Sequence, residues 1–208
     1  MTDEEEFKDH YRNPKGDTGR ELLTGMNHHH MLLWDWCLEK MPKGMDGSVL
    51  DVGCGGGKFL HRMYERYPFA MFFGVDISDT ALEFTSELDS DMVSEGSLEL
   101  RNASVDDLPF EDGSIDLVTA IESYFFWPDL EKAVREVARV TSAGGVFVIG
   151  SEMQTDDPAV MKEGEEKYGA KVRSNEEILS IMDAAGFDAV VKVRPDNGNA
   201  VFVGVKRF

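Results

Sequence analysis

The sequence predicts an α/β protein built on a doubly wound, mostly parallel sheet. Three observations carry this prediction: apolar runs alternate with amphipathic stretches, a glycine-rich segment follows the first apolar run, and two apolar runs close the chain. Alternating strands and helices place helices on both faces of a parallel sheet. The Asn197-Gly198 pair between the last two runs favours a tight turn, so the sheet should end in an antiparallel hairpin.

Each element follows from its local pattern. Seven segments have the length and apolar content of strands: 48–53, 70–77, 97–104, 114–123, 144–153, 188–194 and 199–208. Four segments have helical periodicity: 58–67, 78–92, 129–140 and 174–187. Ser78 and either Ser174 or Asn175 are the expected N-caps, and Gly186 ends the last helix.

Two regions fall outside this alternation. Residues 1–44 are expected to form a polar, partly loose segment and then an amphipathic helix from Leu22 to Met41, and together they would cover a pocket in the main domain, 45–208. Segment 154–173 is polar and lacks a clear strand. It is either a lid or insertion, or a long surface loop.

Composition limits the classes of function. The 208 residues suit one domain, and 40 acidic against 21 basic residues give a net charge of −19. Such a charge repels nucleic acids and anionic membranes, although solubility alone also explains it. No apolar stretch has the ~18 residues of a membrane span, the N-terminus lacks a signal peptide pattern, and only Cys37 and Cys54 could pair. We therefore expect a cytoplasmic protein without a membrane span.

The segment VLDVGCGGGKFL, residues 49–60, has four glycines in five positions. Backbone N–H groups of such a loop can approach a ligand closely. A phosphate-binding P-loop is disfavoured because Val52 and Phe59 stand where it needs glycine and a hydroxyl side chain. A dinucleotide fingerprint is disfavoured because Lys58 replaces its third glycine. Asp76, at the end of the next predicted strand, is placed to accept both hydroxyls of a ribose.

These segments carry a family resemblance. DVGCGGG, GVDIS and ASVDDLPFEDGSIDLV resemble motifs of class I S-adenosylmethionine-dependent methyltransferases, especially small-molecule enzymes of the quinone-biosynthesis group. The resemblance covers roughly residues 45 to 150. It implies a Rossmann-like seven-stranded sheet of order 3-2-1-4-5-7-6, S-adenosyl-L-methionine as cofactor, and a methyltransferase activity (EC 2.1.1.-).

The resemblance also implies the cofactor contacts. Asp51, Gly53, Cys54 and Gly55 would hold the methionyl end, Asp76 the ribose, and Ile77 one adenine face. Ser104 and the Val105 N–H would meet the adenine edge. Ser104 departs from the family, which has an aspartate there, and the neighbouring Asp106 is an alternative. Glu122 would line both the methionyl group and the acceptor, or else is an ordinary surface residue.

Candidate acceptor residues follow the fourth strand and lie in the N-terminal helix. Neighbours in the aromatic run 124–127 must point apart, so some of Tyr124, Phe126 and Trp127 would line a cavity or interface, unless the run simply packs in the core. A flat, aromatic acceptor would suit them. Asn27 is a further candidate for acceptor binding.

The run His28–His30 has three readings. His30, together with Glu122, is a candidate catalytic residue, as a general base or an acceptor contact. Alternatively the histidines are solvated or cap a helix. We expect no metal site, because successive helical residues point ~100° apart and three cannot converge.

The function predicted is methyl transfer from S-adenosylmethionine to a small molecule by in-line displacement. The alternative is a non-catalytic protein that binds this cofactor in a regulatory or partner role. The acceptor atom and the oligomeric state stay open, with a homodimer as one option, and no nucleic-acid partner is expected.

Overall fold

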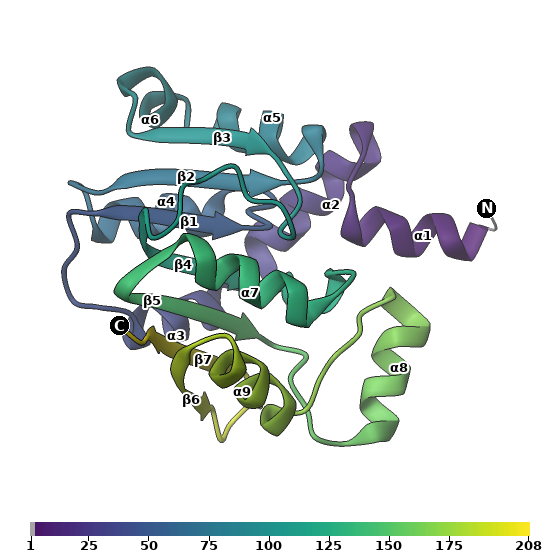
Figure 1. Cartoon of the computed structure of the whole chain (residues 1–208). Coiled ribbons are helices and arrows are strands. Elements are labelled where there is room, and N and C mark those ends of the chain that lie inside the picture. Colours follow the sequence, from purple (N-terminus) through teal and green to yellow (C-terminus); the bar gives the residue numbers. More distant parts are fainter. Residues whose placement is uncertain (1–2) are drawn as a thin grey trace.

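The computed structural model describes residues 3–208, so the first two residues of the predicted N-terminal segment lie outside it. One seven-stranded sheet runs through the described chain in the order β3-β2-β1-β4-β5-β7-β6 (Figure 1). Its strands are β1 (Ser48–Val52), β2 (Met71–Asp76), β3 (Leu98–Asn102), β4 (Ile115–Ile121), β5 (Thr141–Ser151), β6 (Phe187–Val193) and β7 (Ala200–Lys206). β7 is antiparallel to both β5 and β6, and the other pairs are parallel. The predicted fold class, hairpin and strand order are confirmed.

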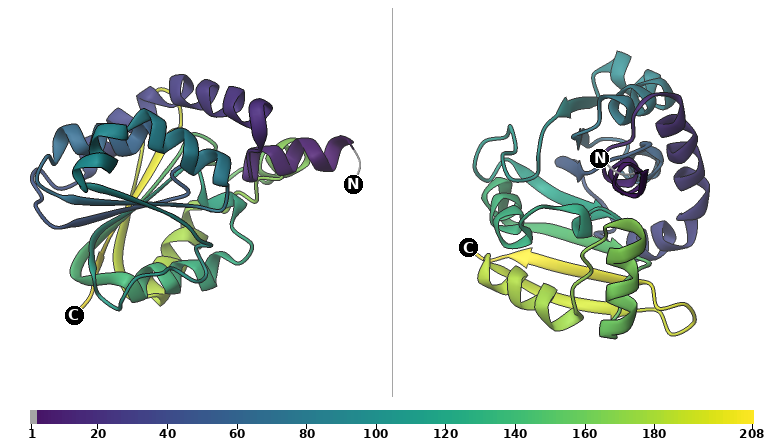
Figure 2. Two further views of the ribbon diagram at one scale, coloured as in Figure 1. Left: turned by 90° about the horizontal axis from the view of Figure 1, so that it is seen from above. Right: turned by 90° about the vertical axis from the view of Figure 1, so that its right-hand side faces the viewer.

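Helices cover both faces of the sheet, as Figure 2 shows from above and from the side. The two faces carry separate apolar clusters. One lies under α7 (Leu130–Val140) and α9 (Asn175–Ala184), and the other under α3 (Met31–Lys40) and α4 (Lys58–Arg66). α7 shows why: all its buried side chains fall on the stripe that faces the sheet.

Helix ends follow the capping residues of the sequence. Ser78 accepts from the Ala81 N–H at the start of α5 (Asp79–Leu88). Ser174 and Glu177 form a reciprocal capping box at the start of α9. The predicted single helix over 78–92 is two helices, because Asp89 leaves helical geometry and α6 (Ser90–Glu95) starts after it.

The N-terminal region is more helical than expected. Where a loose segment was predicted the structure has α1 (Asp3–Arg12), and the predicted helix from Leu22 to Met41 is divided into α2 (Gly16–His29) and α3. His30 separates α2 from α3 with φ −86° and ψ 14°. This break decides where the neighbouring histidine rings point.

Segment 154–173 contains a helix rather than a long loop. α8 (Pro158–Tyr168) begins with Asp157, whose side chain accepts from the Ala159 N–H, and ends at Gly169 in the left-handed region. Tyr168 at its end meets Tyr11 of α1 edge to face, with ring centroids 5.3 Å apart. Within residues 3–208, no helix combines the length and apolar character needed to cross a membrane.

Candidate functional site

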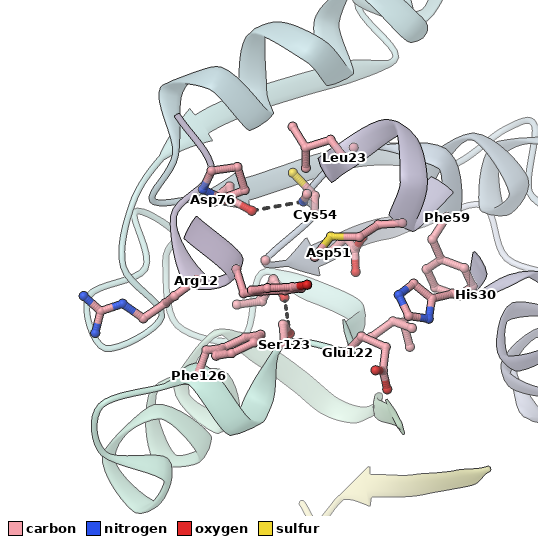
Figure 3. Close-up of a pocket in the computed structure, with 18 of the residues that line it drawn as sticks. Arg12, Leu23, His30, Asp51, Cys54, Phe59, Asp76, Glu122, Ser123 and Phe126 are labelled. Atoms are coloured by element: carbon pink, nitrogen blue, oxygen red, sulfur yellow. Dashed lines mark hydrogen bonds between the residues drawn. The ribbon is translucent and has the colours of Figure 1, made fainter. Parts of the chain in front are cut away.

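A cavity of about 850 Å³ lies beyond the carboxyl ends of β1, β2 and β4. This is where ligands bind in doubly wound sheets, because the connections leaving neighbouring strands diverge there. Tyr11, Asn27 and His30 from the N-terminal helices line the cavity together with the glycine loop. Figure 3 shows Asp76 on one side of it and His30, Glu122 and Phe59 on the other.

The glycine loop is pinned to the neighbouring strand. The N–H groups of Gly53 and Cys54 both donate to the Val75 carbonyl, at 2.8 and 3.1 Å. Gly53 has φ +76°, and a Cβ there would lie 2.7 Å from the Ser123 Cβ. A Cβ on Gly57, at φ +75°, would meet Thr85 at 2.6 Å. Contacts within the protein therefore require these two glycines whether or not a ligand is present.

Gly55 has different surroundings. At φ +54°, the nearest atom to a Cβ there is a Leu23 methyl carbon 3.9 Å away. Gly55 lines the cavity, so the space beside it is free. The predicted close approach of a ligand to bare backbone thus fits Gly55 in particular.

Asp76 ends β2 with its carboxylate held by the backbone. One oxygen accepts from the Gly55 N–H at 3.0 Å and the other from the Ser78 N–H at 2.9 Å. Burial raises the pKa of this carboxyl group, and the backbone donors oppose the rise. Each oxygen keeps a further lone-pair site, so two hydroxyl groups of a sugar could still bind. Ile77, which is 40% exposed, lines the cavity next to it.

Asp51 lines the cavity on the same side as the glycine loop and Asp76. The Thr119 hydroxyl donates to it at 2.5 Å, and its side chain is buried. Burial raises the pKa of Asp51 to about 7. The neighbouring Cys54 is also buried, and burial raises the pKa of its thiol well above the usual value.

Ser104 and Val105 line the cavity beyond Asp76. The Ser104 hydroxyl donates to Asp106 at 2.8 Å, and Asp106 also pairs with Lys132 at 3.4 Å. Since the Ser104 proton is taken by Asp106, the free lone pairs of the Ser104 oxygen are available to an N–H donor. Asp106 is not among the described residues that line the cavity, so it orients Ser104 instead of replacing it.

Glu122 follows β4 and has an unusual backbone. Its φ of +55° is the one positive value among the described non-glycine residues. Such strain persists where surrounding contacts enforce it, and it is concentrated at functional sites. The Glu152 N–H donates to the Glu122 carboxylate at 2.6 Å. Burial raises the pKa of Glu122 to about 7.

His30 faces Glu122 and is held by Glu152. The His30 Nδ1 lies 2.9 Å from a Glu152 oxygen. Burial opposes protonation of His30, but the hydrogen bond to Glu152 and the charge of Glu122 outweigh it and raise the pKa of His30.

Sequence reasoning missed Glu152, which belongs to no motif. It also assumed one continuous helix across the histidines, and that premise was wrong: the break at His30 brings His29, His30 and Glu152 together, while His28 instead contacts the Thr24 carbonyl.

The aromatic run divides between core and cavity. Tyr124 is 1% exposed and donates to Gln154 at 2.7 Å, and it lies outside the described cavity lining. Phe126 and Trp127 do line the cavity. The sequence-based placement of Tyr124 in the acceptor pocket therefore finds no support in its contacts.

Asn27 lines the cavity and ties α2 to the glycine loop. Its amide donates to the Gly56 carbonyl at 2.8 Å. A Cβ on Gly56 would lie 2.7 Å from the Asn27 amide nitrogen, which explains why glycine is needed at this position.

Sequence reasoning also missed Trp34 and Phe59, two apolar side chains of the cavity wall, because their helical spacing indicated only core positions.

The strand order, the glycine loop and the carboxylate at the tip of β2 define a class I methyltransferase fold, with a cavity that has room for a nucleoside and a second group beside it. The residues present fit S-adenosylmethionine, because the space beside Gly55 is free and Asp76 keeps unused acceptor sites.

Comparison with known proteins agrees with this class. Residues 50–149 match the model of the methyltransferase domain family. The chain is 33% identical over 135 residues to a 2-methyl-6-phytyl-1,4-hydroquinone methyltransferase of Synechocystis, covering 64% of this chain and 39% of the relative. Curated relatives of this kind are matched over 30% to 52% of their own length, so the chain spans about half of them or less. It carries a class I methyltransferase domain, whose family uses S-adenosylmethionine, and the resemblance seen in the sequence is confirmed.

Solved structures show the same fold. A chain of the Haloferax volcanii complex between the Trm112 methyltransferase activator and a methyltransferase superposes with a TM-score of 0.81 at 20% identity, covering 98% of both chains. Phosphoethanolamine N-methyltransferase 2 of Haemonchus contortus, solved with S-adenosyl-L-methionine, gives 0.76 at 17% identity, covering 97% of this chain and 60% of that one.

Proposed function

We propose that the chain transfers a methyl group from S-adenosylmethionine to a small-molecule acceptor by in-line displacement. The observation that carries this proposal is one cavity with two unlike ends: the glycine loop and Asp76 at one, and Glu122, His30 and aromatic side chains at the other. The sulfonium of the cofactor supplies an already activated methyl group. The protein's main task is then alignment and exclusion of water, and orientation alone contributes about 7 kcal/mol or more.

The cofactor half is assigned to the residues that the resemblance implied. Asp76 accepts the ribose hydroxyls with the two lone-pair sites that Gly55 and Ser78 leave free. Ile77 lies against one adenine face, and the Ser104 hydroxyl oxygen accepts from the adenine amino group beside the Val105 N–H. Asp51 and the backbone from Gly53 to Gly55 hold the methionyl end. Asp51 also offers a carboxylate to the cofactor's ammonium.

The acceptor half is formed by Glu122, His30 and an apolar wall. Phe126, Trp127 and Phe59 present faces that suit a flat, aromatic or otherwise apolar acceptor. Glu122 and His30 are the groups placed to bind the acceptor's polar atom or to take its proton. Asn27, also a candidate for acceptor binding, lines the same cavity and fixes the glycine loop at the cofactor end through Gly56.

The N-terminal helices are proposed to cover the pocket. Residues from α1, α2 and α3 line the cavity, and Tyr11 closes its mouth against Tyr168 of α8. Residues 1–44 would then form the cover and 45–208 the methyltransferase domain proper. A net charge of −19 disfavours nucleic-acid acceptors, and a cytoplasmic location agrees with two unpaired cysteines.

Calorimetric titration and methyl transfer test the proposal together. S-adenosylhomocysteine should bind and NAD should not. Radiolabelled methyl groups from S-adenosylmethionine should then appear in at least one member of a panel of small aromatic acceptors. Tight cofactor binding with no transfer to any acceptor would favour the alternative, a non-catalytic cofactor-binding protein. Binding of NAD alone would overturn the proposal. Light scattering on the same preparation determines whether the chain is a homodimer.

A further inference from the structure

We propose that His29, His30 and Glu152 form a binding site for a divalent transition-metal ion of the zinc type at the mouth of the cavity. This inference is independent of the methyl-transfer proposal. It rests on three potential ligand atoms, one from each residue, that all lie within 4.8 Å of one another.

The break between α2 and α3 creates the arrangement. In a continuous helix the rings of adjacent residues would point ~100° apart. With His30 outside helical geometry, the two rings lie edge to face, with centroids 5.1 Å apart and planes at 86°. Both rings therefore reach the same carboxylate, on the segment that follows β5.

The distances suit a metal ion. A Glu152 oxygen lies 2.9 Å from the His30 Nδ1 and 3.7 Å from the His29 Nε2. Around a tetrahedral Zn²⁺, bond lengths of ~2.0–2.2 Å place neighbouring ligand atoms about 3.3 Å apart. These two separations lie on either side of that value, and the two imidazole nitrogens lie within 4.8 Å of each other. To admit the ion, the His30–Glu152 pair would have to widen by a few tenths of an ångström and the exposed His29 ring would have to turn inward.

The chemistry of the donor set points the same way. Two imidazoles and a carboxylate are ligands of zinc sites that keep one position open. In the described chain the Glu152 carboxylate has no Lys or Arg partner, only the two histidines. Its backbone is fixed by the hydrogen bond from its N–H to Glu122. A dication would offset the negative charge that the Glu152 carboxylate brings to the cavity mouth.

The three residues lie at the acceptor half of the cavity. His29, His30 and Glu152 all line it, as does Glu122. A bound ion could therefore hold an acceptor oxygen or nitrogen there.

Titration of the chelator-treated full-length protein with Co²⁺, followed by visible absorption and by displacement with Zn²⁺, tests the site. We expect one ion per chain. His29→Ala and Glu152→Gln should each weaken binding at least tenfold, since even groups supporting a metal ligand are typically worth 10–100-fold. His28→Ala is the matched control and should bind as the wild type, because His28 turns to the Thr24 carbonyl.

Two further measurements keep the result interpretable. The His29 side chain is 76% exposed, so His29→Ala should keep the melting temperature of the wild type. Its affinity for S-adenosylhomocysteine should also be unchanged, which separates the metal site from the cofactor site. Equal Co²⁺ affinity in the wild type, His28→Ala and His29→Ala, or binding without a 1:1 endpoint, would overturn the metal site. Failure of S-adenosylhomocysteine to bind while Co²⁺ binds would overturn the proposed function and leave the metal site standing.

Discussion

At the scale of single residues, the four glycines of the loop after β1 are needed for different physical reasons. Gly53, Gly56 and Gly57 are required by Ser123, Asn27 and Thr85, whose atoms a Cβ would meet below 3 Å. Gly55 has no such neighbour and opens onto the cavity. Close approach of a ligand is therefore needed to explain only one of the four.

Gly55→Ala tests that distinction. The new Cβ would enter the cofactor space, and we expect the affinity for S-adenosylhomocysteine to fall at least tenfold by calorimetry, about 1.4 kcal/mol. Gly96→Ala is the control, because Gly96 has φ +76° and open space around it. Both variants should lose about 1–2 kcal/mol of stability to left-handed strain, but only Gly55→Ala should lose affinity. Equal affinity in the two variants would contradict a cofactor lying against Gly55.

Asp76→Asn keeps the side-chain shape while it removes the charge. We expect S-adenosylhomocysteine to bind more weakly by about 1.5–3 kcal/mol, the range for hydrogen bonds to charged groups. Asp107→Asn, at an exposed aspartate outside the cavity lining, serves as the control. An unchanged affinity in Asp76→Asn would mean that the ribose lies elsewhere.

Asp51 links stability to pH. Its pKa of about 7 in the folded state lies above the ~3.9 of an unfolded aspartate. The folded protein therefore binds the proton more tightly, and the stability that Asp51 contributes is lost as pH rises from about 4 to about 7. In the Asp51→Asn variant the amide cannot ionise, and its oxygen can still accept from Thr119. This variant should thus be more stable than the wild type at pH 8, by up to about 4 kcal/mol, with a smaller gap at pH 5. Urea unfolding at both pH values measures this gap, and a gap independent of pH would contradict the account.

Where a motif carries the chemistry, the predicted residues lie together at the cavity, and their roles in binding the cofactor stay predictions. Gly55, Asp76, Ile77 and Ser104 all line the cavity, as their motifs implied. Glu152 was out of reach, because its role depends on a long-range contact with a residue 122 positions earlier. Tyr124 could not be separated from Phe126, since an aromatic run does not reveal which ring faces the core.

At the scale of elements, the strands were predictable and the N-terminal helices only in part. Buried strands such as β2 are continuous apolar runs, which leave few alternatives. The break at His30 has no glycine or proline to signal it. α1 and α8 are polar enough to resemble loops, and their tertiary contacts, such as the one between Tyr11 and Tyr168, are invisible in sequence.

The contact between α1 and α8 predicts a kinetic effect. Tyr11→Ala removes an aromatic pair worth about 0.5–1.5 kcal/mol at the cavity mouth. The dissociation rate of S-adenosylhomocysteine should rise by up to about tenfold in stopped-flow displacement. Phe69→Ala, at a ring that is 85% exposed and outside the cavity lining, should leave that rate unchanged. Equal rates in the wild type and Tyr11→Ala would argue against a cover formed by α1.

At the scale of the whole molecule, apolar packing stabilises the folded state and the net charge destabilises it. Two apolar clusters stabilise the sheet from both faces. A net charge of −19 adds self-repulsion to the compact state. Composition predicted this charge but not the acidic groups, Asp51, Asp76, Glu122 and Glu152, that gather around the cavity.

Stability should therefore depend on salt. Raising chloride salt from about 0.05 to about 1 M shortens the screening length to ~3 Å, so the melting temperature should rise. NaCl and KCl should act equally, because screening depends on ionic strength. A melting temperature that stays constant or falls would show that self-repulsion is not a significant cost to this fold.

A crystal structure with S-adenosylhomocysteine tests the central claim most directly. The account predicts the ribose hydroxyls within hydrogen-bond distance of Asp76, bare backbone of Gly55 against the ligand, and the sulfur turned toward Glu122 and His30. A nucleoside bound away from Asp76, or side chains filling the space beside Gly55, would contradict it.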